Sequence, residues 1–190
     1  MLVEPIESRV MLSGNVSVRI TDSQVQFIGD TAANSLTVTY SSADNQLAIA
    51  GTNGTTIDGR SSRTYAARDN IAMSLGAGDD LVTLQRLSGE FNVGVDLGEG
   101  NDAVYFKRAA ILAADFFGGA GNDTLDITGS IFRKRLRISP GEQDDVTALR
   151  NVRARTGLEI TDTAGKTVVA MQELSAAAPH GFRAATAKMR

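Results

Sequence analysis

The chain has 190 residues and a mass of 20.0 kDa, enough for one or two domains with a hydrophobic core. Hydrophobic residues make up 42% of it but aromatic residues only 5%, so Val, Ile, Leu and Ala must form most of the core. The absence of Cys excludes a disulfide framework and thiolate metal sites. Residues 1–129 carry 16 acidic and 8 basic side chains, whereas residues 130–190 carry 6 and 11, so the two parts could prefer different partners.

Residues 1–14, "MLVEPIESRVMLSG", lack both the basic and the apolar segment of a secretory signal. Within them, Glu4 to Ser13 resembles the short LEPxxxRxLLS signature found near the start of many exported or cell-surface planctomycete proteins. The resemblance covers about ten residues and implies an extracellular or cell-surface location. It starts almost at Met1, where the pattern normally follows a short basic leader. The alternative is a disordered or edge-strand N-terminus.

The region from residue 15 to residue 70 is rich in short runs that favour strands, separated by Asn, Gly, Asp and Ser turns. Two of its segments, residues 31–38 ("TAANSLTV") and 53–59 ("NGTTIDG"), lie roughly one period apart and have lost most of the glycines of the turns described next. We therefore expect them to form capping or degenerate coils.

Four turns of one composition follow: "LGAGDD" (75–80), "LGEGND" (97–102), "GGAGND" (118–123) and "PGEQDD" (140–145). Their final aspartates are separated by 22, 21 and 22 residues. Each turn lies between two strand-like runs, and a second, less regular turn completes the repeat. Helical periodicity is not sustained anywhere in this region.

Two short strands and two turns in about 21–22 residues describe one coil of an all-β β-solenoid (β-helix or β-roll-like), whose coils stack about 4.8 Å apart. A hairpin meander is the competing topology, but nothing in a meander requires every second turn to share the same composition. We expect the solenoid to span residues 15–172, closed by a hairpin around Ala164 and Gly165. Residues 173–190 read as a mobile Ala-rich tail.

The glycine turns resemble the calcium-binding nonapeptide G-G-x-G-x-D-x-U-x of RTX-type (hemolysin-type) repeats. "GGAGNDTLD" (118–126) matches every specified position, and the two preceding turns replace only the first Gly by Leu. RTX repeats recur every nine residues on both edges of a roll, whereas only one turn per coil matches here, so the resemblance covers a loop chemistry over about 75 residues. We expect Leu75 and Leu97 to face inward, filling space that Gly118 leaves empty.

The resemblance implies a row of Ca²⁺ ions held between adjacent coils, because one turn alone cannot supply the roughly 6 to 8 oxygens that Ca²⁺ prefers. Stacked carboxylates without a cation would also repel one another. The alternative is that Gly, Asn and Asp are simply good turn formers, with Asn101 and Asn122 forming a hydrogen-bonded ladder without metal. The implied ligands are Gly76, Gly78, Asp80, Gly98, Gly100, Asp102, Gly119, Gly121, Asp123 and, least regularly, Asp145.

The sequence thus favours an exported calcium-binding β-solenoid with a structural or adhesive role. The alternatives are a calcium-independent structural β-solenoid or a module that binds anionic polysaccharide or the cell surface through Arg133, Arg135 and Arg137, which would share one face of a strand. In that case Arg150, Arg153 and Arg155 could extend the stripe, although a solvated strand facing acidic coils also explains it.

Catalysis is not expected. The only histidine, His180, lies in the Ala-rich tail, and a polysaccharide-active β-helix enzyme would need more coils and longer loops. No apolar run reaches the roughly 20 residues of an integral membrane span, and nucleic acid is not expected as a partner.

Overall fold

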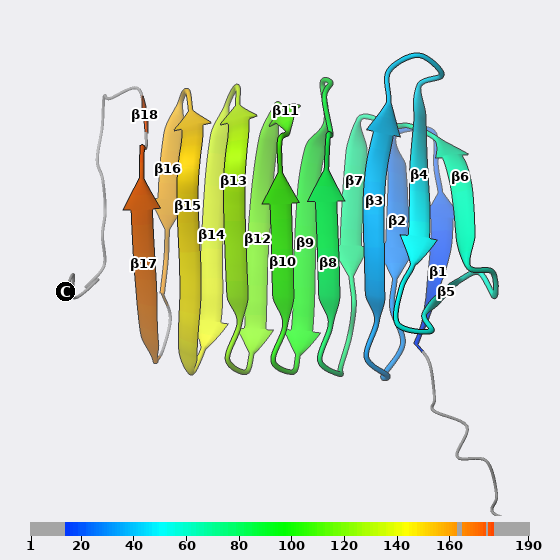
Figure 1. Cartoon of the computed structure of the whole chain (residues 1–190), viewed down its shortest axis with the longest axis horizontal. Coiled ribbons are helices and arrows are strands. Elements are labelled where there is room, and N and C mark those ends of the chain that lie inside the picture. The colour runs from blue at the N-terminus through cyan, green and yellow to red at the C-terminus, as the bar shows by residue number, and fades with distance from the viewer. Residues whose placement is uncertain (1–13, 163–164, 174, 177–190) are drawn as a thin grey trace, which may run out of the picture.

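The computed structural model describes residues 14–162, 165–173 and 175–176. These residues form two stacked β-sheets of eight and ten strands, which run the length of the molecule (Figure 1). In spatial order the eight-stranded sheet contains β16 (Gly157–Ile160), β14 (Arg135–Glu142), β12 (Ala113–Ala120), β9 (Asn92–Glu99), β7 (Asn70–Ser74), β2 (Gln24–Ile28), β1 (Asn15–Ile20) and β5 (Thr56–Ile57).

The ten-stranded sheet faces the viewer in Figure 1. In spatial order it contains β17 (Lys166–Gln172), β15 (Asp144–Ala154), β13 (Thr124–Phe132), β10 (Ala103–Lys107), β8 (Leu81–Gln85), β3 (Ser35–Ser41), β4 (Gln46–Gly51) and β6 (Ser62–Ala66), with β11 (Ala110–Ile111) beside β13 and β18 (Ser175–Ala176) beside β15. No helix that could cross a membrane occurs in the described part of the chain.

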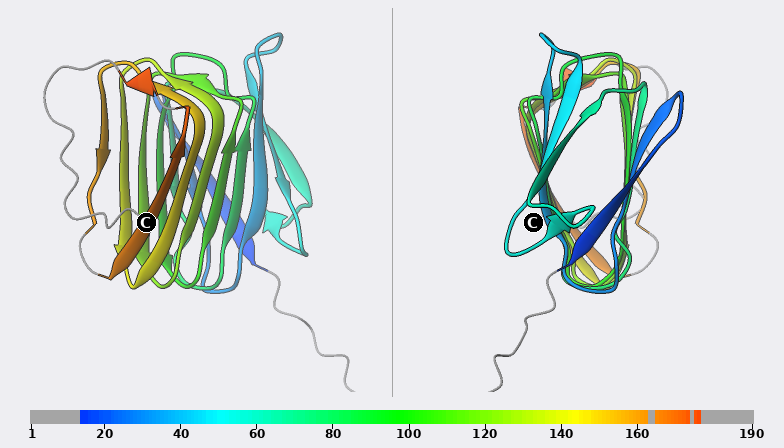
Figure 2. Two further views of the ribbon diagram at one scale, coloured as in Figure 1. Left: turned by 60° about the vertical axis from the view of Figure 1, so that its left-hand side comes forward. Right: turned by 90° about the vertical axis from the view of Figure 1, so that its right-hand side faces the viewer.

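From β7 onward the long strands alternate between the two sheets, and every neighbouring pair within a sheet is parallel; the two-residue strands β11 and β18 follow β10 and β17 in the same sheet. Ala103 of β10, for example, pairs in parallel with Leu81 on one side and Thr124 on the other. A meander would give antiparallel pairs, so this register confirms the predicted all-β solenoid. Figure 2 shows the coils stacked one behind another around a flattened interior.

The N-terminal end departs from the repeat. β1 pairs with β2, and β4 with both β3 and β6, in antiparallel fashion. Residues 31–34 form the turn that leads into β3, in line with the glycine turns, whereas residues 53–55 connect β4 to β5 within the antiparallel cap. The two degenerate segments of the sequence therefore have different roles, the first in a coil and the second in the cap.

The C-terminal end corrects one prediction. β16 pairs with β14 and β17 with β15, each in parallel and in different sheets, so these strands form a last coil and not a closing hairpin. Ala164 itself lies outside the described residues, whereas β18, in the predicted tail, pairs with β15. The export-signature segment before residue 14 and His180 also lie outside the described part of the chain.

The core lies between the sheets and is built from alternate strand residues, as the period of two requires. Val82 and Leu84 of β8 and Val104 and Phe106 of β10 are at most 1% exposed. Phe106 stacks on Phe132 at a ring-centroid distance of 5.5 Å and meets Phe116 edge-on at 5.6 Å. Phe106, Phe116 and Phe132 thus lie within the predominantly aliphatic core that the composition predicts.

Candidate functional site: an aspartate column between the coils

The glycine turns all lie on one edge of the solenoid, where each coil passes from the eight-stranded to the ten-stranded sheet. The residues that follow them are in register, Leu81 with Ala103, Thr124 and Val146. The aspartates that precede these residues are therefore stacked. We call Asp80, Asp102, Asp123 and Asp145 the aspartate column, and its existence confirms that the turns share one edge.

Each carboxylate of the aspartate column joins two coils. The backbone N–H of Asp80 donates to Oδ1 of Asp102 at 2.7 Å, that of Asp102 to Asp123 at 2.9 Å, and that of Asp123 to Asp145 at 2.9 Å. All four side chains belong to residues that are 5% exposed or less. A buried N–H without a partner costs about 1–3 kcal/mol, so each carboxylate satisfies a donor that the turn would otherwise leave unpaired.

The column has neutral ends that sequence reasoning missed. Asn34 takes the equivalent place before Asp80, because Ser35 pairs with Leu81, and its N–H donates to Oδ1 of Asp80 at 2.6 Å. Thr167 takes the place after Asp145. Asn34 lies 46 residues before Asp80, because β4 to β6 are inserted between them. It therefore does not fit the period of 21–22 residues that relates the other column positions.

A second ladder runs beside the column on the solvent side. Asn101 N–H donates to Oδ1 of Asp79 at 2.8 Å, Asn122 N–H to Oδ1 of Asn101 at 3.0 Å, and Asp144 N–H to Oδ1 of Asn122 at 3.1 Å. These bonds run from a later coil to an earlier one, opposite to those of the column. Adjacent coils are thus joined in both directions, and the hydrogen-bonded ladder that Asn101 and Asn122 suggested is present.

The glycines allow the coils to approach this closely. A Cβ on Gly98, whose φ is +102°, would lie 1.9 Å from the carbonyl oxygen of Gly76. Gly119 has the same relation to Gly98, also at 1.9 Å. The glycines predicted as calcium ligands therefore have a steric role that a side chain would prevent. In the fourth turn Gln143 holds a φ of +80° at the place of the second glycine.

The second oxygen, Oδ2, of every column aspartate is buried and has no hydrogen-bond partner among the described residues. Beneath Gly118 a cavity of about 20 Å³, lined mainly by apolar side chains, also reaches Asp123. The corresponding places of the two preceding coils hold Leu75 and Leu97, which are 0% and 4% exposed. These leucines face inward as predicted. Gly118 borders the cavity, but a Cβ on it would lie 1.7 Å from the Pro140 carbonyl oxygen, so the position itself has no room for a side chain.

Burial dominates the acid–base behaviour of the column. It raises the pKa of Asp80 from its ordinary 3.8 to about 7 and that of Asp123 to about 6, despite the opposing effect of the backbone hydrogen bonds. Burial also raises the pKa of Asp102 and Asp145, and neighbouring acids add to both shifts. The aspartates therefore gain protons on folding in the mildly acidic range.

Several oxygens of the turns take part in hydrogen bonds between the coils. Oδ1 of each carboxylate accepts an inter-coil bond. Two carbonyls of the turns also accept inter-coil bonds, Gly76 O from Glu99 N–H and Ala120 O from Gly100 N–H, both at 2.8 Å. Within the described ranges no group of three or more His, Cys, Asp or Glu side chains could hold a metal ion. The Oδ2 atoms of the column accept no hydrogen bond from the described residues.

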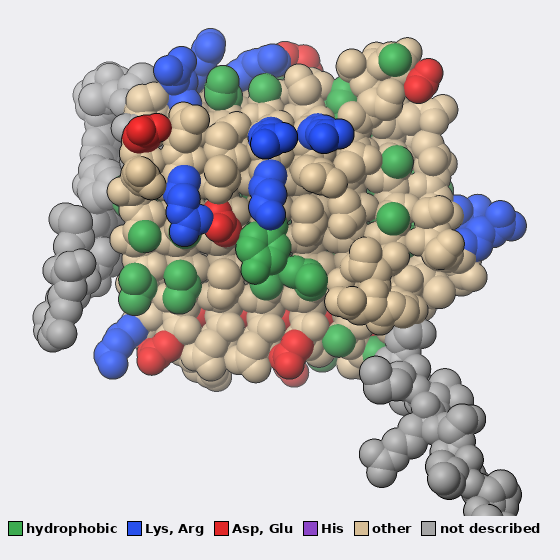
Figure 3. All heavy atoms as spheres, viewed as in Figure 1, with side chains coloured by type: hydrophobic (Ala, Val, Ile, Leu, Met, Phe, Trp, Pro, Cys, Tyr) green, Lys and Arg blue, Asp and Glu red, His purple; other side chains and the backbone are tan. Residues whose placement is uncertain are grey.

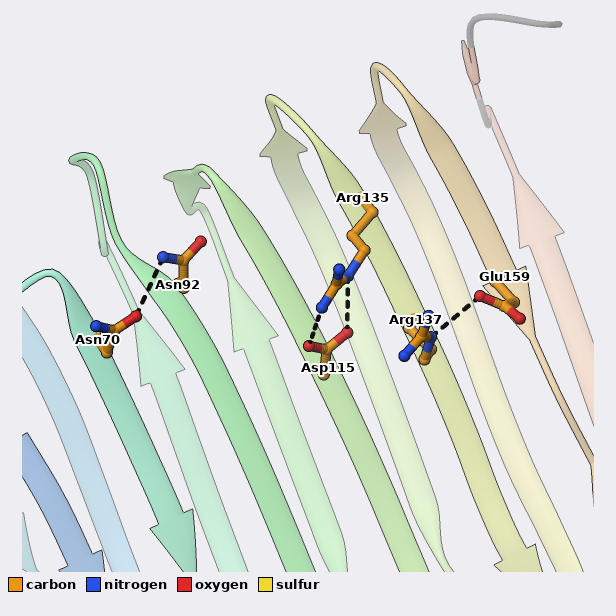
Figure 4. Close-up of polar contacts among 6 residues, drawn as sticks. All are labelled: Asn70, Asn92, Asp115, Arg135, Arg137 and Glu159. Atoms are coloured by element: carbon orange, nitrogen blue, oxygen red, sulfur yellow. Dashed lines mark hydrogen bonds and ion pairs between the residues drawn. The ribbon is translucent and has the colours of Figure 1, made fainter. Parts of the chain in front are cut away.

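The predicted arginine stripe is not a single free basic surface. Arg133 is not on the predicted strand, because it lies in the turn between β13 and β14. Its side chain pairs with Glu90. Arg135 binds Asp115 through two bonds of 2.8 and 3.2 Å, and Arg137 binds Glu159 at 3.0 Å (Figure 4).

The suggested extension of the stripe lies on the other sheet. Arg150 and Arg153 belong to β15, and Arg155 follows that strand, whereas Arg135 and Arg137 belong to β14 of the eight-stranded sheet. Arg150 pairs with Asp126 at 2.5 Å. The interpretation of a solvated strand that faces acidic coils describes Arg135 and Arg137 best.

The two edges of the solenoid differ in their exposed charges, although Glu90 also places an acid on the edge opposite the glycine turns. The glycine-turn edge carries exposed Asp79, Glu99 and Glu142, whereas the turns of the opposite edge carry exposed Arg86 and Arg108. In Figure 3, which views the ten-stranded sheet, most Lys and Arg side chains lie over the upper half, whereas Asp and Glu lie both along the lower rim and in the upper half. No family model, curated protein or solved structure matches the chain, so these features of the molecule itself carry the functional argument.

Proposed function

We propose that this chain is a structural β-solenoid in which side-chain hydrogen bonds, and not bound ions, join successive coils. The observation that carries the proposal is that Oδ1 of each column aspartate accepts a backbone N–H of the preceding coil. The carboxylates thus have a structural role that needs no cation. The solvent-side ladder of Asp79, Asn101 and Asn122 acts in the same way.

The neutral residues at the ends support this proposal. Asn34 carries an amide where the following coils carry a carboxylate, and the coil still stacks in register. The coil therefore stacks without a carboxylate at this place, although Asn34 Oδ1 itself accepts no hydrogen bond from the described residues.

Calcium binding, export and an adhesive role at the cell surface remain predictions from the RTX-like turns and the N-terminal signature. One experiment separates calcium binding from the structural proposal: thermal unfolding of the full chain at pH 8, followed by circular dichroism, in chelator and in excess CaCl₂, with MgCl₂ as the control for ionic effects. We expect the same melting temperature in all three.

A calcium site filled at 100 times its dissociation constant would stabilise the fold by about 2.7 kcal/mol. For a chain of this size, 1 kcal/mol corresponds to about 2–4 °C, so one site would raise the melting temperature by about 5–10 °C. A calcium-specific rise of that size, absent with MgCl₂, would overturn the proposal and restore the calcium prediction.

A further inference from the structure

An open groove of about 830 Å³ crosses the outer face of the eight-stranded sheet, on β2, β7, β9, β12 and β14. Asn70, Asn92, Asp115 and Arg135 line it, and the small residues Ala72 and Gly94 lie between them. The groove lies away from the aspartate column, so the stacking of the coils does not explain it.

Gly94 has no structural reason to be glycine. It lies in the middle of β9, its φ is not in the left-handed region, and a Cβ built on it would meet nothing within 4 Å. Glycine inside a strand costs about 0.5–1 kcal/mol relative to alanine and often marks a place where a ligand approaches the backbone closely. Here that place is the floor of the groove.

The polar groups beside this floor are held in place by one another. Asn92 Nδ2 donates to Asn70 Oδ1 at 3.1 Å, and Asn70 Nδ2 donates to the Ser23 carbonyl at 3.0 Å. On the other side, Asp115 accepts both bonds from Arg135, and Figure 4 shows the two pairs on neighbouring coils. Side chains fixed before binding lose little conformational entropy when a ligand arrives.

The side chains that line the groove have both donors and acceptors that are not used in hydrogen bonds with one another. Asn92 Oδ1 accepts no bond from the described residues, and the Arg135 guanidinium has further N–H donors beyond the two that bind Asp115. The charges of Asp115 and Arg135 cancel, and Lys134 alone adds a positive charge to the lining. None of the lining residues is aromatic, so the groove offers no stacking platform for nucleic-acid bases.

We propose that this groove binds a neutral oligosaccharide chain laid across the strands over Gly94. Each sugar hydroxyl both donates and accepts, which matches an amide oxygen on one wall and a guanidinium–carboxylate pair on the other. Successive coils repeat the strands about every 4.8 Å, so an extended polymer meets side chains at regular intervals. Without an aromatic platform the binding is weak for one site, and a polymer is the appropriate probe.

The test is native affinity electrophoresis of the full chain in gels that contain laminarin, dextran, mannan or galactan, with polygalacturonate as the acidic probe. We expect at least one neutral polysaccharide to retard the protein. Gly94→Val, which fills the floor, should weaken the retardation at least about tenfold while leaving the melting temperature unchanged or higher, because Val favours a strand.

Gly157→Val is the matched control. Gly157 lies on the same sheet and also has nothing within 4 Å of a built Cβ. It pairs with Arg135 at the margin of the groove but does not line it. Its variant should migrate like the unchanged protein. Asn92→Ala provides a second groove variant if Gly94→Val folds poorly, and it should also weaken retardation.

No retardation by any neutral polysaccharide, retardation by polygalacturonate alone, or equal losses in the groove and control variants would overturn the proposal. These outcomes are independent of calcium and of the aspartate column, so they leave the structural proposal untouched.

Discussion

Replacing Asp80 with asparagine is expected to stabilise the protein at pH 8 and to have little effect near pH 4.5. The side chain is 2% exposed, and its Oδ1 accepts the Asn34 N–H, a bond that an asparagine Oδ1 can also accept. The change removes a carboxylate that burial makes costly to ionise. Asn34 occupies the adjacent position of the same column and shows that the fold accommodates an amide there.

The size of the effect follows from the pKa of Asp80, which burial raises from 3.8 to about 7. At about 1.36 kcal/mol per pH unit, ionising the folded form costs up to about 4 kcal/mol. A buried amide N–H₂ without a partner costs about 1–3 kcal/mol in return, which leaves a net gain of about 1–3 kcal/mol at pH 8. Near pH 4.5 the Asp80 carboxyl of the folded protein is protonated, and its O–H group has no partner, like the N–H₂ group of asparagine. The aspartate and asparagine forms should therefore have nearly equal stability at this pH.

The same shift sets the pH dependence of the unchanged protein. Because the folded pKa lies above the unfolded pKa, the folded state binds more protons between about pH 4 and pH 7. The contribution of Asp80 to stability is therefore fully present below pH 3.8 and is lost as the pH rises through about 7. Asp123, with a pKa of about 6, adds a parallel loss.

The assay is thermal or urea unfolding of Asp80→Asn and the unchanged chain, in chelator, from pH 4.5 to pH 8. We expect the difference between the two to grow with pH, and the profile of the variant to be flatter. A variant that is less stable than the unchanged protein at pH 8, but equal to it at pH 4.5, would refute the reasoning. It would mean that the folded protein needs the charged carboxylate, as a cation site would.

Two further predictions concern the column and its glycines. Asp102→Ala and Asp145→Ala should destabilise the protein by similar amounts, about 1–3 kcal/mol each in urea unfolding, because each leaves one backbone N–H of the preceding coil unpaired. A markedly larger loss of stability for Asp102→Ala would indicate an ion that Asp102 shares with both neighbouring coils. Gly98→Ala should cost more than about 2 kcal/mol, since its Cβ would overlap the Gly76 carbonyl, whereas Gly94→Ala should be neutral or stabilising. Equal melting temperatures for these two glycine variants would contradict the steric role of Gly98.

Much of the fold could be predicted from spacing alone. Four turns with glycines and a final aspartate, 21 or 22 residues apart, predict parallel coils with the aspartates on one edge, and the parallel pairing of Ala103 with Leu81 and Thr124 confirms this. A fixed interval between like turns has few geometric solutions, because each coil must return to the same edge after the same number of residues. The insertion of β4 to β6 after Asn34 breaks this interval, so the sequence did not reveal that Asn34 occupies the column position next to Asp80.

The local pattern did not determine what the carboxylates contact. An aspartate after a glycine turn is compatible with an ion, with water or with a neighbouring N–H, and only the stacking of Asp80 under Asp102 at hydrogen-bond distance favours the last. The same holds for Arg135, whose partner Asp115 lies 20 residues away in sequence but on the neighbouring coil.

The groove over Gly94 was equally invisible, since an open surface arises only when side chains from five strands are placed side by side. The amino-acid sequence by itself thus determined the repeat, the strand alternation and the edge that carries the acids, because these depend on intervals along one chain. Contacts between coils depend on distances across the stack, and only the tertiary structure decided them.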